Sequence, residues 1–324
     1  MAAVGPSLYP STYSLPSPKS ASIGPVPMEC FKTLKNDTAG ITAVVPFSDG
    51  RFASGSYDSK IMVWNHDGEP IDTFWNDYFN VRALAPISDT LLACGLAGIP
   101  NGRTTGIVKL WDLHTKDSQI LGTYQTDITA LAVSPEKRLA SGDRLGFFNI
   151  FNPFSKKLEI GSVPTGSQIW SLAFVQNGKM LATGQTNGEI LFWDSHTGKF
   201  LKSFKMHKDA VTALTVLPDG TLVSGSFDGN IILWDTSKDP SQAWIKTLKS
   251  GPVTSLATQG DILVSGSWDK SFTVWDTNTA AFWQSPFTEH QGIIYAVAAF
   301  EDRVVTGSED KTLKLWQSKL KARL

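Results

Sequence analysis

Two parts of the chain carry a histidine, a hydroxyl residue and an aspartate at nearly the same spacing, and these side chains could act together in nucleophilic catalysis. In each set the histidine comes first, and the hydroxyl residue lies four residues before the aspartate. The two sets are His207, Ser224 and Asp228, and His290, Thr306 and Asp310. Hydrolases use a hydroxyl that is activated by an imidazole, which an acid orients. The nucleophile must be exposed beside an oxyanion pocket, so the elements that carry these residues decide whether this chemistry is available.

Other catalytic and metal-binding motifs are absent from the sequence. It has no HExxH, no phosphate-binding loop ending in Gly-Lys-Ser/Thr, and no GxSxG. His66, His114 and His196 fall in predicted turns and are interpreted as surface residues rather than metal ligands. Two cysteines, Cys30 and Cys94, are too few for a disulfide framework or a cysteine-based zinc site. We expect no metal and no cofactor, and a reducing compartment: the cytoplasm, with the nucleus as the alternative.

The composition is that of a folded chain with a distinct N-terminal segment. Of 324 residues, 41% are hydrophobic and 18% are charged, which allows a large core and excludes general disorder. The sequence has no run of 18 apolar residues, so it predicts no membrane-spanning helix. Residues 1–27 hold six prolines, one lysine and no acid, so we expect a disordered tail, with an organelle-targeting segment as the alternative. Residues 318–324 form a short basic end.

Internal repetition is the strongest feature of the sequence. An aromatic residue closes an apolar run seven times, at intervals of 47, 40, 42, 41, 41 and 41 residues: Trp64, Trp111, Phe151, Trp193, Trp234, Trp275 and Trp316. A β-branched residue that is followed two positions later by Ala or Ser begins a second marker, at Ile41, Val81, Ile128, Ile169, Val211, Val253 and Ile294. A third marker is a glycine, at Gly55, Gly95, Gly142, Gly184, Gly225, Gly266 and Gly307. Three markers at one period predict seven copies of one structural unit.

Each repeat is predicted to consist of short β-strands. In the fifth repeat the strands are residues 201–205, 211–216, 222–226 and 230–234, and Asp, Gly and Pro separate them. Such runs are typical of antiparallel strands joined by hairpins. One sheet made of all these strands would twist too far to stay open, whereas small sheets arranged radially leave only short edges. The last repeat offers three strands, and residues 28–35 have the character of the missing outer one.

The repeats resemble the WD-repeat β-propeller family. Trp-Asp closes four of them, at 111–112, 193–194, 234–235 and 275–276, and a Ser-Gly-Ser-x-Asp turn precedes the last two of these pairs. The resemblance covers residues 28–317 and implies an all-β, seven-bladed β-propeller of four-stranded antiparallel blades. It also implies closure of the ring by an N-terminal strand that pairs into the last blade. It says little about function, because one fold hosts many functions.

The resemblance gives the histidine sets a structural interpretation. In this family a blade can carry a His, a Ser or Thr, an Asp and a Trp that are hydrogen-bonded together. Two sets match in full: His207, Ser224, Asp228 and Trp234, and His290, Thr306, Asp310 and Trp316. These tetrads would satisfy polar groups inside a sheet, each bond contributing about 0.5–1.5 kcal/mol. We therefore expect no catalytic residue and no enzyme activity.

A partner site is expected on one rim of the ring. The family's narrow top face is built by the loop entering each innermost strand and by the turn before each third strand. The aromatic and arginine residues that the resemblance places there, together with Arg103 from an insertion at 97–106, are Tyr57, Phe79, Arg82, Arg103, Arg144, Trp170, Phe227, Trp268 and Tyr295. Such residues dominate binding hot spots. The alternative for each ring is packing against a neighbouring turn.

The leading hypothesis is a non-enzymatic protein–protein interaction scaffold or adaptor. It would dock a protein or peptide on the top face within a multiprotein complex, with the propeller itself monomeric. One alternative is RNA binding on the side of Arg82 and Arg144, which the net charge of −1 disfavours. The other is an enzyme that uses the central channel, for which the sequence offers no cluster of ionisable residues.

Overall fold

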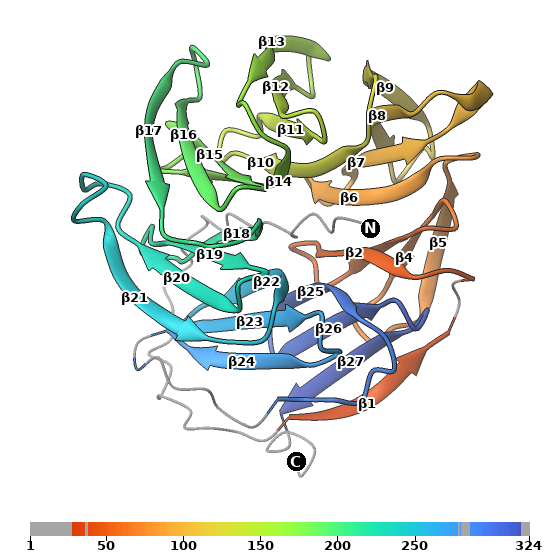
Figure 1. Ribbon diagram of the computed structural model, residues 1–324. Coiled ribbons are helices and arrows are strands. Elements are labelled where there is room, and N and C mark those ends of the chain that lie inside the picture. Colours follow the sequence, from red (N-terminus) through yellow and green to blue (C-terminus); the bar gives the residue numbers. More distant parts are fainter. Residues whose placement is uncertain (1–27, 36–37, 278, 280–285, 319–324) are drawn as a thin grey trace.

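The protein folds into a ring of seven small antiparallel sheets, as Figure 1 shows. The computed structural model describes residues 28–35, 38–277, 279 and 286–318. Within them lie 27 strands and one short 3₁₀ helix, η1 (Pro100–Gly102). The predicted seven-bladed β-propeller is thus confirmed. The predicted disordered tail, residues 1–27, lies outside the described residues, as does the basic end from residue 319 onward.

The blades are numbered from the first innermost strand, and each runs from the axis outward. Blade 1 holds β2 (Ile41–Pro46), β3 (Phe52–Ser56), β4 (Lys60–Trp64) and β5 (Pro70–Trp75). Blade 2 holds β6 (Asn80–Pro86), β7 (Leu91–Gly98), β8 (Thr105–Asp112) and β9 (Ser118–Tyr124). Blade 3 holds β10 (Ile128–Val133), β11 (Leu139–Asp143), β12 (Phe147–Asn152) and β13 (Lys157–Pro164). Blade 4 holds β14 (Ile169–Val175), β15 (Met180–Gln185), β16 (Glu189–Asp194) and β17 (Phe200–Lys205).

The last three blades complete the ring. Blade 5 holds β18 (Val211–Val216), β19 (Leu222–Ser226), β20 (Asn230–Trp234) and β21 (Trp244–Lys249). Blade 6 holds β22 (Val253–Gln259), β23 (Ile262–Ser267) and β24 (Phe272–Asp276), and an isolated bridge joins Phe272 to Phe287 beside β24. Blade 7 holds β25 (Ile294–Phe300), β26 (Arg303–Ser308), β27 (Leu313–Ser318) and, from the other end of the sequence, β1 (Met28–Leu34).

The pairing of β1 with β27 closes the ring. The two strands are antiparallel, with Met28 opposite Ser318 and Leu34 opposite Leu313. Figure 1 shows the first and last colours of the chain side by side in this blade. This confirms the prediction that an N-terminal strand supplies the outer strand of the last blade.

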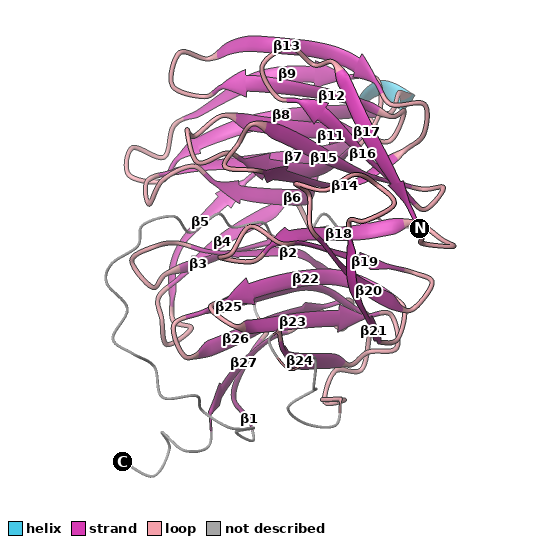
Figure 2. Cartoon of the chain, turned by 90° about the vertical axis from the view of Figure 1, so that its left-hand side faces the viewer, coloured by secondary structure: helices cyan, strands magenta, loops and turns pink. Residues whose placement is uncertain are grey.

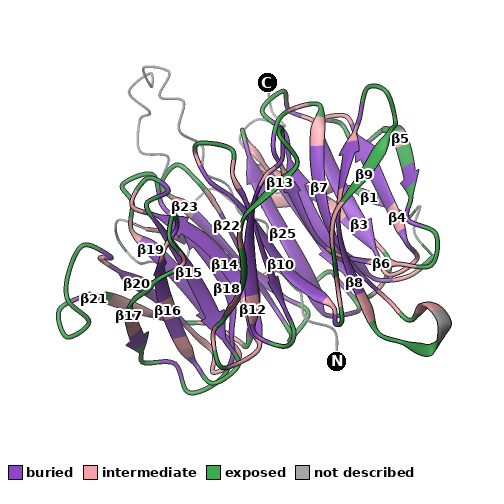
Figure 3. Cartoon of the chain, turned by 90° about the horizontal axis from the view of Figure 1, so that it is seen from above, coloured by how far each residue is buried: buried purple, intermediate pink, exposed green. Residues whose placement is uncertain are grey.

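The core lies between neighbouring blades, whose sheets stack around the ring (Figure 2). The inner strands of each blade are mostly buried, whereas the outermost strands and the turns at the two rims are largely exposed (Figure 3). Two sequence markers meet here: a Cβ on Gly55 would fall 2.4 Å from Val81 in the next blade, and one on Gly225 would fall 2.4 Å from Val253. Only glycine leaves room for the β-branched residue of the next repeat, so these two markers pack as one contact. In the described part of the chain no helix has the length and apolarity that spanning a membrane requires.

A repeated side-chain hydrogen bond also joins the innermost strands. The Thr42 hydroxyl donates to the Val81 carbonyl oxygen at 2.7 Å, and the same bond recurs from Thr129 to Ile169 and from Thr212 to Val253, both at 2.6 Å. In each case threonine directly follows the β-branched residue that begins the second sequence marker. The marker does not specify this position, and the structure shows that its hydroxyl links one blade to the next.

The insertion in the second repeat lengthens a hairpin. At both ends of the insertion at 97–106 the residues pair, Ala97 with Gly106 and Gly98 with Thr105, so β7 and β8 are longer than the corresponding strands of the other blades. The connection that remains is residues 99–104, with η1 inside it. The hydrogen-bonded ladder between β7 and β8 is therefore longer than the corresponding ladders of the other blades, because both strands are longer.

Candidate partner-binding site

The tetrad of blade 5 is a continuous chain of hydrogen bonds. His207 Nδ1 lies 3.1 Å from Asp228 Oδ2, and its Nε2 lies 2.7 Å from Ser224 Oγ. Trp234 Nε1 donates to the same hydroxyl at 2.8 Å. The His207 side chain is 0% exposed, and this burial lowers its pKa even though Asp228 opposes the shift. The hydroxyl is therefore enclosed and cannot reach a substrate.

The tetrad of blade 7 repeats this arrangement. His290 Nδ1 lies 2.8 Å from Asp310 Oδ2, its Nε2 lies 2.7 Å from Thr306 Oγ1, and Trp316 Nε1 donates to Thr306 at 2.9 Å. Burial alone would raise the pKa of Asp310, but hydrogen bonds from His290 and Thr312 hold it well below its usual range. The aspartate is thus an ionised acceptor that orients a buried ring.

Three other blades fill the same place with residues that the sequence analysis did not identify. In blade 2, Trp111 Nε1 donates to Asn76 Oδ1 at 3.0 Å. In blade 3 the Tyr124 hydroxyl lies 3.2 Å from Ser141 Oγ, and in blade 4 Gln185 Nε2 donates to Thr183 Oγ1 at 2.8 Å. Tyr124 stands four residues before the first residue of the inner strand, as His207 and His290 do. That offset is the signal that could have identified it.

Three aromatic rings form a row on the top face. Trp170 and Phe227 meet edge to face with their centroids 5.7 Å apart, and Phe227 meets Trp268 in the same way at 5.6 Å. They come from the inner strand of blade 4 and the turns of blades 5 and 6. Trp268 is 38% exposed, and the other two are half-buried. We call these three residues the aromatic row.

The two tyrosines on this rim are less accessible. Tyr295 is only 6% exposed, and its ring meets Tyr57 edge to face at 6.1 Å. Burial raises the pKa of both phenols, so the hydroxyls stay neutral. Gly40 lies against both rings. Tyr295 therefore packs against its neighbours, which was the alternative open for each ring.

Two arginines share one acid between the tyrosines and the aromatic row. Arg82 Nη1 donates to the Tyr57 hydroxyl at 3.0 Å, and the guanidinium carbon lies 4.9 Å from the centre of that ring. Arg82 Nη2 reaches Asp127 Oδ2 at 3.4 Å, and Arg144 Nη1 approaches the same oxygen at 3.7 Å. Both ion pairs are long, and Arg144 keeps 47% of its side chain exposed. Arg82, Arg144, Asp127 and Trp170 all line one small cavity.

The remaining predicted residues lie on blade 2. Phe79 is half-buried against the backbone of Gly98, where a Cβ would fall 2.7 Å from its ring. Arg103 is exposed in the connection at the tip of the β7–β8 hairpin, beyond the last paired residues. Sequence reasoning missed Tyr78 and Ile99 beside them, which are 89% and 69% exposed. Both lie outside the aligned repeat positions, so the repeat pattern gives no signal for them.

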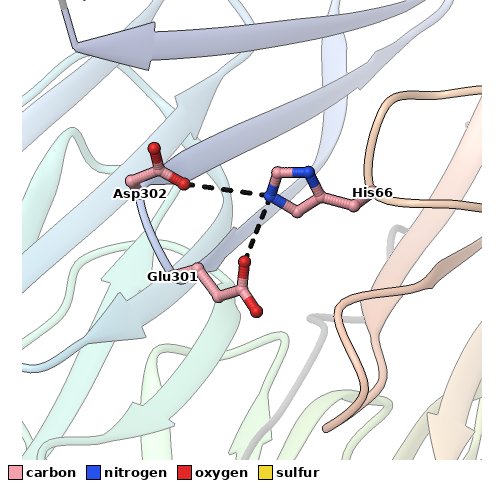
Figure 4. Close-up of side chains that lie close together, drawn as sticks. All are labelled: His66, Glu301 and Asp302. Atoms are coloured by element: carbon pink, nitrogen blue, oxygen red, sulfur yellow. Dashed lines mark ion pairs between the residues drawn. The ribbon is translucent and has the colours of Figure 1, made fainter. Parts of the chain in front are cut away.

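His66 lies in a small charged cluster on the opposite rim, which Figure 4 shows. Its Nε2 is 3.1 Å from Glu301 Oε2 and 3.9 Å from Asp302 Oδ1. Ligand atoms of the three residues lie within 4.8 Å of one another, a spacing that a metal ion could bridge. The same contacts form an ion pair between the turn after β4 and the turn between β25 and β26, so they join blade 1 to blade 7.

Comparisons with known proteins agree with this fold. The family described as WD domain, G-beta repeat matches residues 28–65, 158–194, 198–235, 243–276 and 283–317. The chain is similar to WD repeat-containing protein SL1-17 of Schistosoma mansoni, with 27% identity over 53% of this chain and 56% of that protein. It is also similar to WD repeat-containing protein 55 of Mus musculus, with 29% identity over 43% and 36% of the two chains. A 50-residue stretch is 50% identical to WD repeat and SOCS box-containing protein 1 of Danio rerio, covering 15% and 12%.

The matched segments thus span between one eighth and just over half of these relatives. Blade 2 and the three inner strands of blade 3 fall outside the family match, and in these blades Asn76 and Tyr124 replace the tetrad histidine.

Proposed function

Because this chain belongs to the WD-repeat family, we propose that it is a non-enzymatic interaction scaffold that docks a protein or peptide partner on its top face. The observation that carries the proposal is the aromatic row. Trp170, Phe227 and Trp268 are supplied by three different blades and meet at an exposed rim. Rigid rings held by a stiff scaffold are the residues that anchor partners at little entropic cost.

The tetrads support the non-enzymatic part of the proposal. His207 and His290 have no exposed side-chain surface, and each hydroxyl beside them accepts an indole N–H. A nucleophile needs access to a carbonyl carbon and a nearby oxyanion site. These groups instead hold the third strand of the blade to its turn.

The electrostatics of the rim favour a protein over RNA. Arg82 and Arg144 share Asp127, and Glu309 acts on the tyrosines beside Arg82, so the rim is not a basic surface. RNA binding draws its affinity from many phosphate contacts and is strongly salt-dependent. A salt titration with single-stranded RNA would distinguish the two functions, since a steep slope would favour RNA.

The proposal is tested by affinity capture from a cell extract. Tagged wild type is compared with Trp170→Ala/Trp268→Ala and with a matched control, Trp75→Ala/Trp244→Ala, whose tryptophans are 57% and 52% exposed on the outermost strands of blades 1 and 5. We expect the top-face variant to keep its melting temperature within a few degrees and to lose specific partners about tenfold or more, while the control retains them. Equal capture by both variants would move the partner site away from the top face.

Two further points belong to the proposal and rest on the sequence alone. The propeller is proposed to act as a monomer, and light scattering of the purified protein would reveal a dimer. A cytoplasmic location is proposed, with the nucleus as the alternative, and fluorescence microscopy of a tagged chain would decide.

A further inference from the structure

We propose that Arg82 and Arg144 form a receptor for a carboxylate side chain of the partner, next to an apolar side chain that rests on Trp170. The inference rests on the proposed top-face function and names the chemistry that the partner must bring. It follows from a charged residue at a position that is threonine in four blades, an unsatisfied donor, two long ion pairs and a small cavity.

Arg82 occupies a position where the ring has a different structural need. In blades 1, 3 and 5 this position is a threonine whose hydroxyl bonds to the next blade, and Thr254 does the same in blade 6. Blades 2, 4 and 7 have Arg82, Trp170 and Tyr295 there instead, and of these only blade 2 places a charge at the position. Arg82 thus replaces a stabilising hydrogen bond between blades with a half-buried charge. Stability alone is a poor explanation for this residue.

The guanidinium of Arg82 is also incompletely satisfied. Its Nε is buried and has no hydrogen-bond partner among the described residues. Only 16% of the side chain is exposed, so water has little access to it. An unmade hydrogen bond to a buried charged group is costly, and a carboxylate is the acceptor that matches a guanidinium fork.

The contacts to the nearby acids point the same way. Arg82 and Arg144 share Asp127, and Glu309 acts on the neighbouring Tyr57 and Tyr295. Asp127 lies 3.4 Å from one guanidinium and 3.7 Å from the other, which are long contacts for charge-assisted hydrogen bonds. Neither guanidinium therefore has a short carboxylate contact.

The cavity sets the size of the acceptor and its neighbourhood. Its volume is about 10 Å³, room for one water-sized group, and Arg82, Arg144, Gln168 and Trp170 are among its lining residues. One oxygen of a carboxylate fits this space, and a planar carboxylate is smaller than a phosphate. Trp170 both lines the cavity and begins the aromatic row. The partner is therefore a peptide with an acidic side chain beside an apolar one.

The test uses two neutral-ended dipeptides, acetyl-Glu-Leu-amide and acetyl-Gln-Leu-amide, titrated into the full chain and followed by NMR at the Trp170 indole N–H. We expect wild type to prefer the Glu peptide by at least about fivefold, because only that peptide offers a charged acceptor. Arg82→Thr gives blade 2 the residue of blades 1, 3 and 5. It should abolish this preference while the melting temperature stays equal or rises.

Matched variants make the outcome decisive. Lys199→Thr removes one exposed positive charge elsewhere and should leave the preference unchanged. Asp127→Asn removes the competing carboxylate and should strengthen binding of the Glu peptide, and Arg144→Gln should weaken it without unfolding. A preference that survives Arg82→Thr, or tighter binding of acetyl-phosphoserine-Leu-amide than of the Glu peptide, would overturn the proposal. If Arg82→Thr loses the preference for the Glu peptide but captures protein partners as well as wild type does, that result would count against the top face as the docking surface.

Discussion

At the scale of single residues, burial decides what a histidine does. His207 and His290 share an aspartate and a hydroxyl with the triads of hydrolases, but each imidazole is enclosed between a turn and a strand. Their hydrogen bonds end at an indole donor rather than at a reacting group. The same side chains therefore contribute stability through bonds that water cannot replace.

The first prediction tests this stabilising role. His207→Ala and Asp228→Ala should each lower the free energy of unfolding by roughly 1–3 kcal/mol, because each leaves a buried partner unsatisfied. Chemical denaturation of both single variants and of the double variant should show a coupling of at least about 0.5 kcal/mol. His114→Ala, an exposed histidine in a turn, should change stability by no more than about 0.5 kcal/mol. Additive effects, or two fully stable single variants, would contradict the tetrad.

The sequence could identify residues at aligned positions but not the burial of each ring. Trp268 is on the rim and exposed, as expected, whereas Tyr295 is enclosed by Tyr57 and Gly40. Those contacts depend on which loops of neighbouring blades meet, and repeat alignment carries no such information. The orphaned Nε of Arg82 was equally out of reach, because it follows from the exact placement of Asp127 and Tyr57.

At the scale of elements, the strands could be predicted from the sequence because turn residues separate them in each repeat. In blade 5, the predicted strands 211–216, 222–226 and 230–234 coincide with β18, β19 and β20, and 201–205 lies within β17 of blade 4. The long hairpin of blade 2 was not predicted. Its Gly-rich sequence resembles a loop, but matched lengthening of β7 and β8 lets every added residue up to Gly98 and Thr105 pair.

The hairpin tip provides a prediction at this scale. Replacing residues 99–104 by Asn-Gly should join Gly98 to Thr105 through a two-residue turn that suits antiparallel strands. Since Ile99 and Arg103 are exposed, we expect the free energy of unfolding to change by less than about 1 kcal/mol. Thermal denaturation with circular dichroism measures this, and an alanine substitution at Arg103 alone is the milder comparison. A loss well above 2 kcal/mol would show that the tip packs on the ring.

At the scale of the whole molecule, buried and hydrogen-bonded acids set the response to pH. Burial alone would raise the pKa of Asp228, but backbone N–H bonds and His207 lower it, and the pKa of Asp310 is also depressed. Burial lowers the pKa of His207 below its usual 6.5. Each depressed group stabilises the fold above its unfolded pKa and loses that contribution as the pH falls through its folded pKa. Asp143, whose pKa is raised by burial, acts in the opposite direction.

The chain should therefore lose stability in two stages on acidification. The His207 contribution declines below about pH 6.5, and the aspartate contributions decline below about pH 4. Urea denaturation midpoints measured between pH 3 and 8 would show this. His207→Gln should flatten the curve between pH 5 and 6.5 while leaving the steeper loss below pH 4. A midpoint that rises steadily on acidification would contradict the assignment.

The closure of blade 7 has a consequence for how the chain is made in a cell. Met28 emerges early from a ribosome, but its partner Ser318 is added 290 residues later. At about 5–20 residues per second, β1 waits roughly 15–60 s for the strand beside which it belongs. During that interval blades 1 to 6 can assemble in order from local hairpins, while the edges of the unfinished ring stay open to other strands. The newborn chain thus has a vulnerable period that ends only when β1 and β27 pair.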